Sequence, residues 1–215
     1  MSGAELAGFT ATGFCVVLAI LGLADSPRAF VPRVFAMGML LLGAITACQA
    51  FAASATSLME VVAWHQWKAL VVGVAGATWL LFSLSFARSN SRELLLRSRW
   101  LLLGSVVLPI QLATMFRWSL YALDYAADAP APEFLPLGWA GQVFYAVELL
   151  VAVLILSNLE GTLRASTGSK RWQIKFMVLG IGSIFVVQIY LASQTLLFSS
   201  VHLALEPVGP YTLLV

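Results

Sequence analysis

Six long apolar segments constrain the fold of this chain more than any other feature. They cover residues 6–24, 34–56, 69–87, 100–116, 135–157 and 176–198. Each is close to the roughly 20 residues that a helix needs to cross the hydrocarbon core of a bilayer. Lipid offers the backbone no hydrogen-bond partners, so each segment must satisfy its own N–H and C=O groups as a helix. A β-barrel is disfavoured because the segments are continuously apolar and do not alternate.

The composition agrees with a membrane-embedded chain. Of its 215 residues, 60% are hydrophobic and only 10% are charged, whereas soluble domains carry about 25% charge. We predict an all-α integral membrane protein, a bundle of six transmembrane helices in which the final GPYTLLV could start a seventh. Residues 1–215 are then a single transmembrane domain. Its expected partner is the lipid bilayer, and no nucleic acid is expected.

The basic residues alternate between the two sides of the predicted membrane. Ten of the 12 Lys and Arg residues fall in the first, third and fifth connections. By the positive-inside rule these connections are cytoplasmic and the N-terminus is outside. The fifth connection holds Arg164, Lys170, Arg171 and Lys175. We interpret this cluster first as a topology signal; the alternative is contact with anionic lipid or with a cytoplasmic partner domain.

Polar residues within the spans are candidates for sensing. Glu148 is the only carboxylate near a predicted midplane, where ionisable groups usually face the bundle interior or a wet cavity. It is either a protonated carboxyl bonded to a neighbouring helix or a sensor of protons or a ligand. Helical spacing puts Ser183, Tyr190 and Gln194 on one stripe of the sixth span. We expect this stripe to supply the partner of Glu148. The alternative is that its side chains only hold neighbouring helices together by packing and hydrogen bonding.

The longest outward connection, residues 117–136, is the candidate surface for an external cue. It offers Trp118, Tyr121, Asp124 and Tyr125, although a loop of this composition is often only a solvated linker. The second connection places His65 between two tryptophans on the same side. A lone histidine there is expected to be an interfacial anchor and not a metal ligand, so no metal site is predicted.

One segment resembles a known family. The sequence NLEGTLRASTGSKRWQIKFMVLG, residues 158–180, and the following IYLASQTLLF, residues 189–198, are similar to the membrane region of the PEP-CTERM-system sensor histidine kinases called PrsK, which are associated with exosortase and exopolysaccharide gene clusters. The residues that carry the likeness are Asn158, Leu159, Glu160, Arg164, Ala165, Gly168, Arg171, Trp172, Lys175, Phe176, Gly180, Tyr190, Gln194 and Phe198.

The resemblance implies the sensing region of a bacterial two-component system in the inner membrane. In that family a GAF-like module and the dimerisation and ATP-binding domains follow in the cytoplasm, so it also implies a homodimer and a response-regulator partner. ATP and Mg²⁺ would belong only to those later domains, and no cofactor is expected in this segment. None of the later domains is within residues 1–215, and we expect a chain truncated before them.

Catalysis by these residues alone is not expected. The sequence has no H-E-x-x-H and no G-x-S-x-G motif, which metalloproteases and serine hydrolases need. The phosphoacceptor His and ATP boxes of a kinase are also missing. The alternatives to a sensor are a small multi-span transporter or channel and a membrane scaffold. The sequence does not identify the signal, the oligomeric state or the response regulator.

Overall fold

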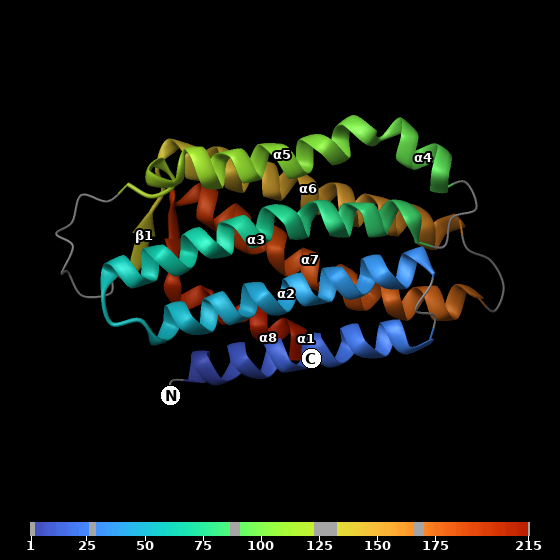
Figure 1. Cartoon of the computed structure of the whole chain (residues 1–215), viewed down its shortest axis with the longest axis horizontal. Coiled ribbons are helices and arrows are strands. Elements are labelled where there is room, and N and C mark those ends of the chain that lie inside the picture. The colour runs from blue at the N-terminus through green and yellow to red at the C-terminus, as the bar shows by residue number, and fades with distance from the viewer. Residues whose placement is uncertain (1–2, 26–28, 87–90, 123–132, 166–169, 215) are drawn as a thin grey trace.

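The computed structural model describes residues 3–25, 29–86, 91–122, 133–165 and 170–214 of the chain. They form an elongated helical bundle (Figure 1). Its long helices are α1 (Gly3–Asp25), α2 (Phe30–Ser54), α3 (Leu58–Ser85), α5 (Arg99–Met115), α6 (Trp139–Ala165) and α7 (Lys170–Leu197). Two short helices, α4 (Ser91–Arg97) and α8 (Val208–Leu214), precede α5 and follow α7. The predicted all-α membrane bundle is confirmed.

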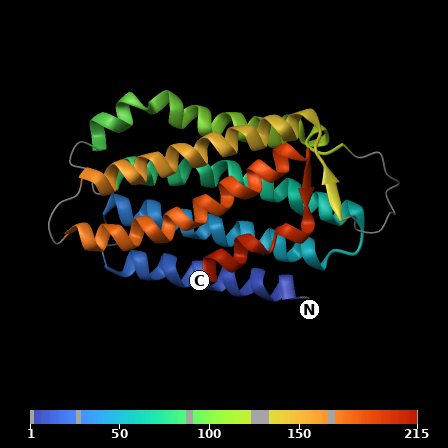
Figure 2. The same ribbon diagram turned by 180° about the vertical axis from the view of Figure 1, so that it is seen from behind.

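The helices are long enough for a bilayer. Within the described residues, α1, α2, α3, α6 and α7 are long and apolar enough to cross a membrane, and α5 is a shorter apolar helix of 17 residues. Helix α8 packs on α1 and α7 and runs back into the bundle beside α1 (Figures 1 and 2). It contains most of the segment GPYTLLV, which the sequence offered as the start of a seventh span.

Two short strands close one end of the bundle. Strand β1 (Phe134–Pro136) pairs antiparallel with β2 (Ser200–His202), and Tyr121 forms an isolated bridge with Leu137. This sheet joins the start of α6 to the end of α7. We call this end the hairpin end after these two antiparallel strands, although α6 and α7 separate them in the sequence. We call the opposite end, where α1, α3 and α6 finish, the basic end. Sequence reasoning missed both strands because three residues are too few to show alternation.

Helix α3 starts earlier than the sequence predicted. It begins at Leu58, not at residue 69, and its N-cap Ser57 accepts a hydrogen bond from the Glu60 N–H. The Glu60 carboxylate accepts in return from the Thr56 N–H, an arrangement close to a capping box. The expectation that His65 lies in an outer connection as an interfacial anchor is therefore wrong. A search for apolar runs stops at the polar residues of the first turns, although they lie within the helix.

The core is built around α3. Trp79 is 1% exposed and packs edge-on against Phe35 and Phe185. Gly38 lets α2 approach this ring, since a Cβ there would lie 2.8 Å from Trp79 Cε2. Small residues at helix contacts are typical of membrane bundles, where close packing and not the hydrophobic effect holds the helices together.

Candidate functional site

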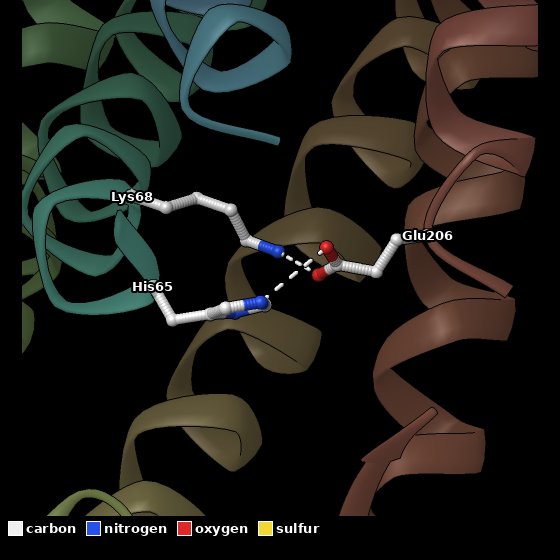
Figure 3. Close-up of polar contacts among 3 residues, drawn as sticks. All are labelled: His65, Lys68 and Glu206. Carbon is white, nitrogen blue, oxygen red and sulfur yellow. Dashed lines mark hydrogen bonds and ion pairs between the residues drawn. The ribbon is translucent and has the colours of Figure 1, made fainter. Parts of the chain in front are cut away.

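A buried ion pair at the hairpin end links α3 to the segment that leads into α8. Lys68 donates a hydrogen bond to Glu206 Oε1, and His65 Nε2 lies 3.5 Å from Glu206 Oε2. His65 and Lys68 are one turn apart on α3, so both point toward the same carboxylate (Figure 3). Their side chains are 0% and 12% exposed, and that of Glu206 is 13% exposed. These three residues form what we call the ion-pair cluster.

The electrostatics keep Glu206 charged. Burial by itself raises the pKa of a carboxyl group, but the neighbouring His65 and Lys68 and the hydrogen bond from Lys68 outweigh it, so the pKa of Glu206 lies below its ordinary value. Glu206 is therefore ionised at neutral pH, and Lys68 supplies the compensating charge. Neither ring nitrogen of His65 makes a hydrogen bond with the described protein atoms.

Two tyrosines complete the surroundings of the cluster. Tyr121 is 4% exposed and meets the His65 ring edge-on, with 6.1 Å between centroids. Its side chain also interacts electrostatically with that of Tyr145 on α6. Burial raises the pKa of Tyr121 well above its ordinary value, so its phenol is neutral. Tyr121 is therefore buried and not on the exposed surface of the connection in which the sequence placed it, and its role in meeting an external cue stays a prediction.

A cavity lies next to the ion-pair cluster. It has a volume of about 70 Å³, and since a cavity needs roughly 10–15 Å³ to admit one water, it has room for more than one water or for a small molecule. Its apolar walls include Ile45, Val72, Phe144 and Leu191. Its polar groups come from α2, α3, α6, α7 and the β2–α8 segment: Gln49, His65, Lys68, Tyr145, Glu148, Gln188, Gln194, Thr195, His202 and Glu206.

Glu148 lies on the wall of this cavity. It is 6% exposed, and its Oε1 has no hydrogen-bond partner among the described residues. Gly76 on α3 leaves room for it, because a Cβ there would lie 3.2 Å from Glu148 Oε2. A second hollow of about 50 Å³, which Trp79 also lines, meets Glu148 from the basic end. The carboxyl thus faces the protein, as the sequence predicted.

The predicted partners of Glu148 are placed differently. Ser183 is exposed and bonds the Gly180 carbonyl of its own helix, and Tyr190 is 50% exposed. Of the stripe only Gln194 lines the cavity, whereas Gln188, on the opposite side of the helix, lines both hollows beside Glu148. The expectation that this stripe supplies the partner of Glu148 rests on the tendency of sequential helices to be neighbours, which does not say which side of α7 meets α6. In the structure, α7 turns its Gln188 face inward instead.

The remaining predicted residues lie at the two ends of the bundle. At the hairpin end Trp118 is 70% exposed, with the Arg117 guanidinium 5.1 Å from its ring centroid; Asp124 and Tyr125 lie outside the described residues. At the basic end Arg164 pairs with Glu160 on the surface of α6. Lys175 lies over the Trp172 ring at 5.3 Å.

Two residues of the basic cluster have no described side chain. Lys170 and Arg171 open α7, but their side chains lie outside the described part of the chain. Of the predicted residues, Glu148 and Gln194 therefore line the cavity, whereas Trp118, Arg164 and Lys175 lie on the surface at the two ends. It adds a set that the sequence did not single out, the ion-pair cluster.

Comparison with known families agrees with this architecture. Residues 8–209 match the family model described as the N-terminal 7TM region of histidine kinase. No curated protein and no solved structure matches the chain closely enough to count as a relative. The match covers nearly the whole chain, including the ion-pair cluster, the cavity and the start of α8. The chain therefore belongs to the family of N-terminal seven-transmembrane regions of histidine kinases.

Proposed function

We propose that this region senses its signal in the cavity at the hairpin end and transmits it through α8. One observation carries the proposal: Glu206, two residues before α8 begins at Val208, lies on the cavity wall and is paired with Lys68 of α3. A change in the cavity therefore acts on the residue that holds the start of the last helix. In a seven-helix kinase this helix leads toward the catalytic domains.

The energy of the ion pair is of the order that such a switch requires. Removing one partner of a buried pair costs about 3–5 kcal/mol, and moving a two-state equilibrium from 1:99 to 99:1 takes about 5.5 kcal/mol. A ligand that weakens or strengthens the Lys68–Glu206 contact would change the free-energy difference between two positions of α8 by a comparable amount. The signal needs no contact with the kinase itself.

The test is kinase activity in a Lys68 variant. We propose that the natural reading frame continues past codon 215 into the kinase domains, where ATP and Mg²⁺ would bind and a response regulator would be phosphorylated by a homodimer. In vesicles holding that protein, Lys68→Met should change the basal autophosphorylation rate severalfold. Glu160→Gln, which removes a charge at an exposed position of α6, should leave it unaltered. Equal rates in both variants and the wild type would reject the sensing role of the cluster.

We further propose that the region lies in a bacterial inner membrane with its N-terminus outside. The support is the charge asymmetry, since the basic end carries Arg33, Arg97, Arg164 and Lys175 among the described residues. A cysteine at Ser169 should then resist a membrane-impermeant thiol reagent in intact cells, in a background without Cys15 and Cys48. One at Ala129 should react. The opposite labelling pattern would overturn the orientation.

The signalling pathway is a separate proposal. The likeness of residues 158–198 to the PrsK kinases supports a role in the regulation of PEP-CTERM proteins and exopolysaccharide. Deletion of the gene in its host should change exopolysaccharide output, and a gene copy that ends before the kinase domains should not restore it. Unchanged output after deletion would remove this role and leave the sensing proposal standing.

A further inference from the structure

Glu148 is a buried carboxyl group, and one of its oxygens has no hydrogen-bond partner among the described residues. Its Oε1 makes no hydrogen bond with the described residues although the side chain is only 6% exposed. Buried carboxylates are normally hydrogen-bonded or paired with a cation, because an isolated charge is costly to bury. This group opens into the cavity, so a molecule in the cavity can supply the missing partner.

The charges around the cavity favour a cation as that molecule. Lys68 is the one Lys or Arg side chain on the described walls of either hollow, and Glu206 already neutralises it. The side chains that line both hollows with Glu148 are apolar or amides: Ile45 on α2, Val72 on α3 and Gln188 on α7. The Tyr145 phenol on α6 is a further, uncharged neighbour. Glu148 is therefore the one acidic group on the described walls that has no basic partner there, so a cation would stabilise its ionised form and an anion would not.

The donor set favours an organic ammonium over a metal ion. The described residues contain no group of three His, Cys, Asp or Glu side chains that could hold a metal. Hard cations take six or more oxygen ligands, which one carboxylate and a few amides do not provide. An ammonium head group needs only about three acceptors, and the carboxylate together with the Gln188 amide oxygen can supply them.

The size of the cavity limits the rest of the ligand. A volume of about 70 Å³ is well above the roughly 10–15 Å³ that a cavity needs to admit one water, so there is room for a small molecule. The walls beside the amides are hydrocarbon from Ile45, Val72 and Phe144, which suits a short alkyl chain. An alcohol of the same size would fill this space but would leave the carboxylate without a counter-charge.

We propose that the cavity binds a small primary ammonium ion, with its head group on Glu148 and Gln188 and its short alkyl body against the apolar wall. Such a ligand would be a candidate for the signal of this sensor, and that role, unlike the binding itself, rests on the proposed sensing function. The ligand would lie between α2, α3, α6 and α7, next to the ion-pair cluster that holds the start of α8.

The test is stabilisation of the purified chain in lipid nanodiscs by n-butylammonium chloride. At a hundredfold excess over Kd, binding should raise the midpoint of thermal unfolding by about 5–10 °C. Sodium chloride at equal ionic strength and n-butanol at equal concentration should not. Glu148→Gln should abolish the rise, whereas Glu160→Gln, the same change at an exposed position of α6, should retain it.

Several results would overturn the proposal. One is an equal rise of the unfolding midpoint with n-butanol, and another is an equal rise in Glu148→Gln. The third is no rise in the wild type at about 100 mM amine, a concentration that would detect even binding with a millimolar Kd. If Glu148→Gln does not fold, Gln188→Leu replaces it and should weaken apparent binding at least about tenfold; unchanged affinity would reject the site. If the amine fails to stabilise the chain but Lys68→Met changes the kinase rate, the amine proposal is rejected and the proposed sensing role of the ion-pair cluster stands.

Discussion

Replacing Lys68 by Met tests whether the ion-pair cluster holds α8 in place. Met keeps the length and apolar stem of the lysine but leaves Glu206 buried without its cation. Loss of one partner of a buried pair costs about 3–5 kcal/mol. We expect the lower end of this range, about 3 kcal/mol, because the carboxylate borders a cavity that can admit water. Since each 1.4 kcal/mol is a factor of ten, local opening of α8 should become about a hundredfold more frequent.

Hydrogen exchange measures this opening directly. The Gly209 and Tyr211 amides of α8 donate to the Glu206 and Pro207 carbonyls at 3.2 and 3.1 Å, so their exchange reports whether α8 is docked. In nanodiscs, Lys68→Met should speed their exchange by up to about a hundredfold. The matched control Lys175→Met alters an exposed lysine at the basic end and should leave it unchanged.

The reasoning is refuted if exchange of α8 in Lys68→Met stays within about threefold of the wild type, less than 1 kcal/mol. It is also refuted if Lys175→Met produces the same acceleration, because the effect would then be global. Exchanging the charges, with Lys68→Glu and Glu206→Lys in one chain, should restore part of the protection. A pair that acts only by filling space would show no such recovery.

Two further predictions concern stability. Gly38→Ala should lower the free energy of unfolding by about 1–3 kcal/mol, because its Cβ would lie 2.8 Å from the rigid Trp79 ring. The control Gly104→Ala, where a Cβ would have no atom within 4 Å, should be neutral or stabilising by up to about 1 kcal/mol. Thermal unfolding of both variants and the wild type measures the difference. The pKa of Glu206 is lower in the folded chain, so its stabilisation should be complete above about pH 4.3 and fade as the pH falls through the folded pKa. Acid unfolding of wild type and Glu206→Gln should therefore differ at neutral pH and converge in acid; a constant difference would contradict the charge pairing.

The bundle could be predicted because its physical cause is local. Each apolar segment must be a helix in lipid wherever its neighbours lie, and the inward position of Glu148 follows from the cost of exposing it to lipid. The ion-pair cluster could not be predicted in the same way, because it joins residues of α3 to Glu206 near the other end of the sequence. Its one local signal was the capping sequence of Ser57 and Glu60, which places Lys68 well inside α3.

The facing side of α7 shows a different limit of sequence reasoning. Helical spacing correctly separated Ser183 and Tyr190 from Gln188, since the two sides differ in exposure in the structure. Spacing does not say which side meets α6, because both sides carry polar groups. The short strand β2 directly after α7, held by β1, is among the contacts that orient this helix, and it left no periodic pattern in the sequence.

The central claim is that the contents of the cavity control the kinase through α8. It is tested most directly by filling the cavity covalently. In full-length protein lacking Cys15 and Cys48, a cysteine replaces Ala192 on the cavity wall and is methylthiolated with a small membrane-permeant reagent. We expect the autophosphorylation rate of Ala192→Cys to change severalfold on modification, while Gly104→Cys, which faces open space on α5, keeps its rate. Complete modification of Ala192→Cys with no change in rate would contradict the claim.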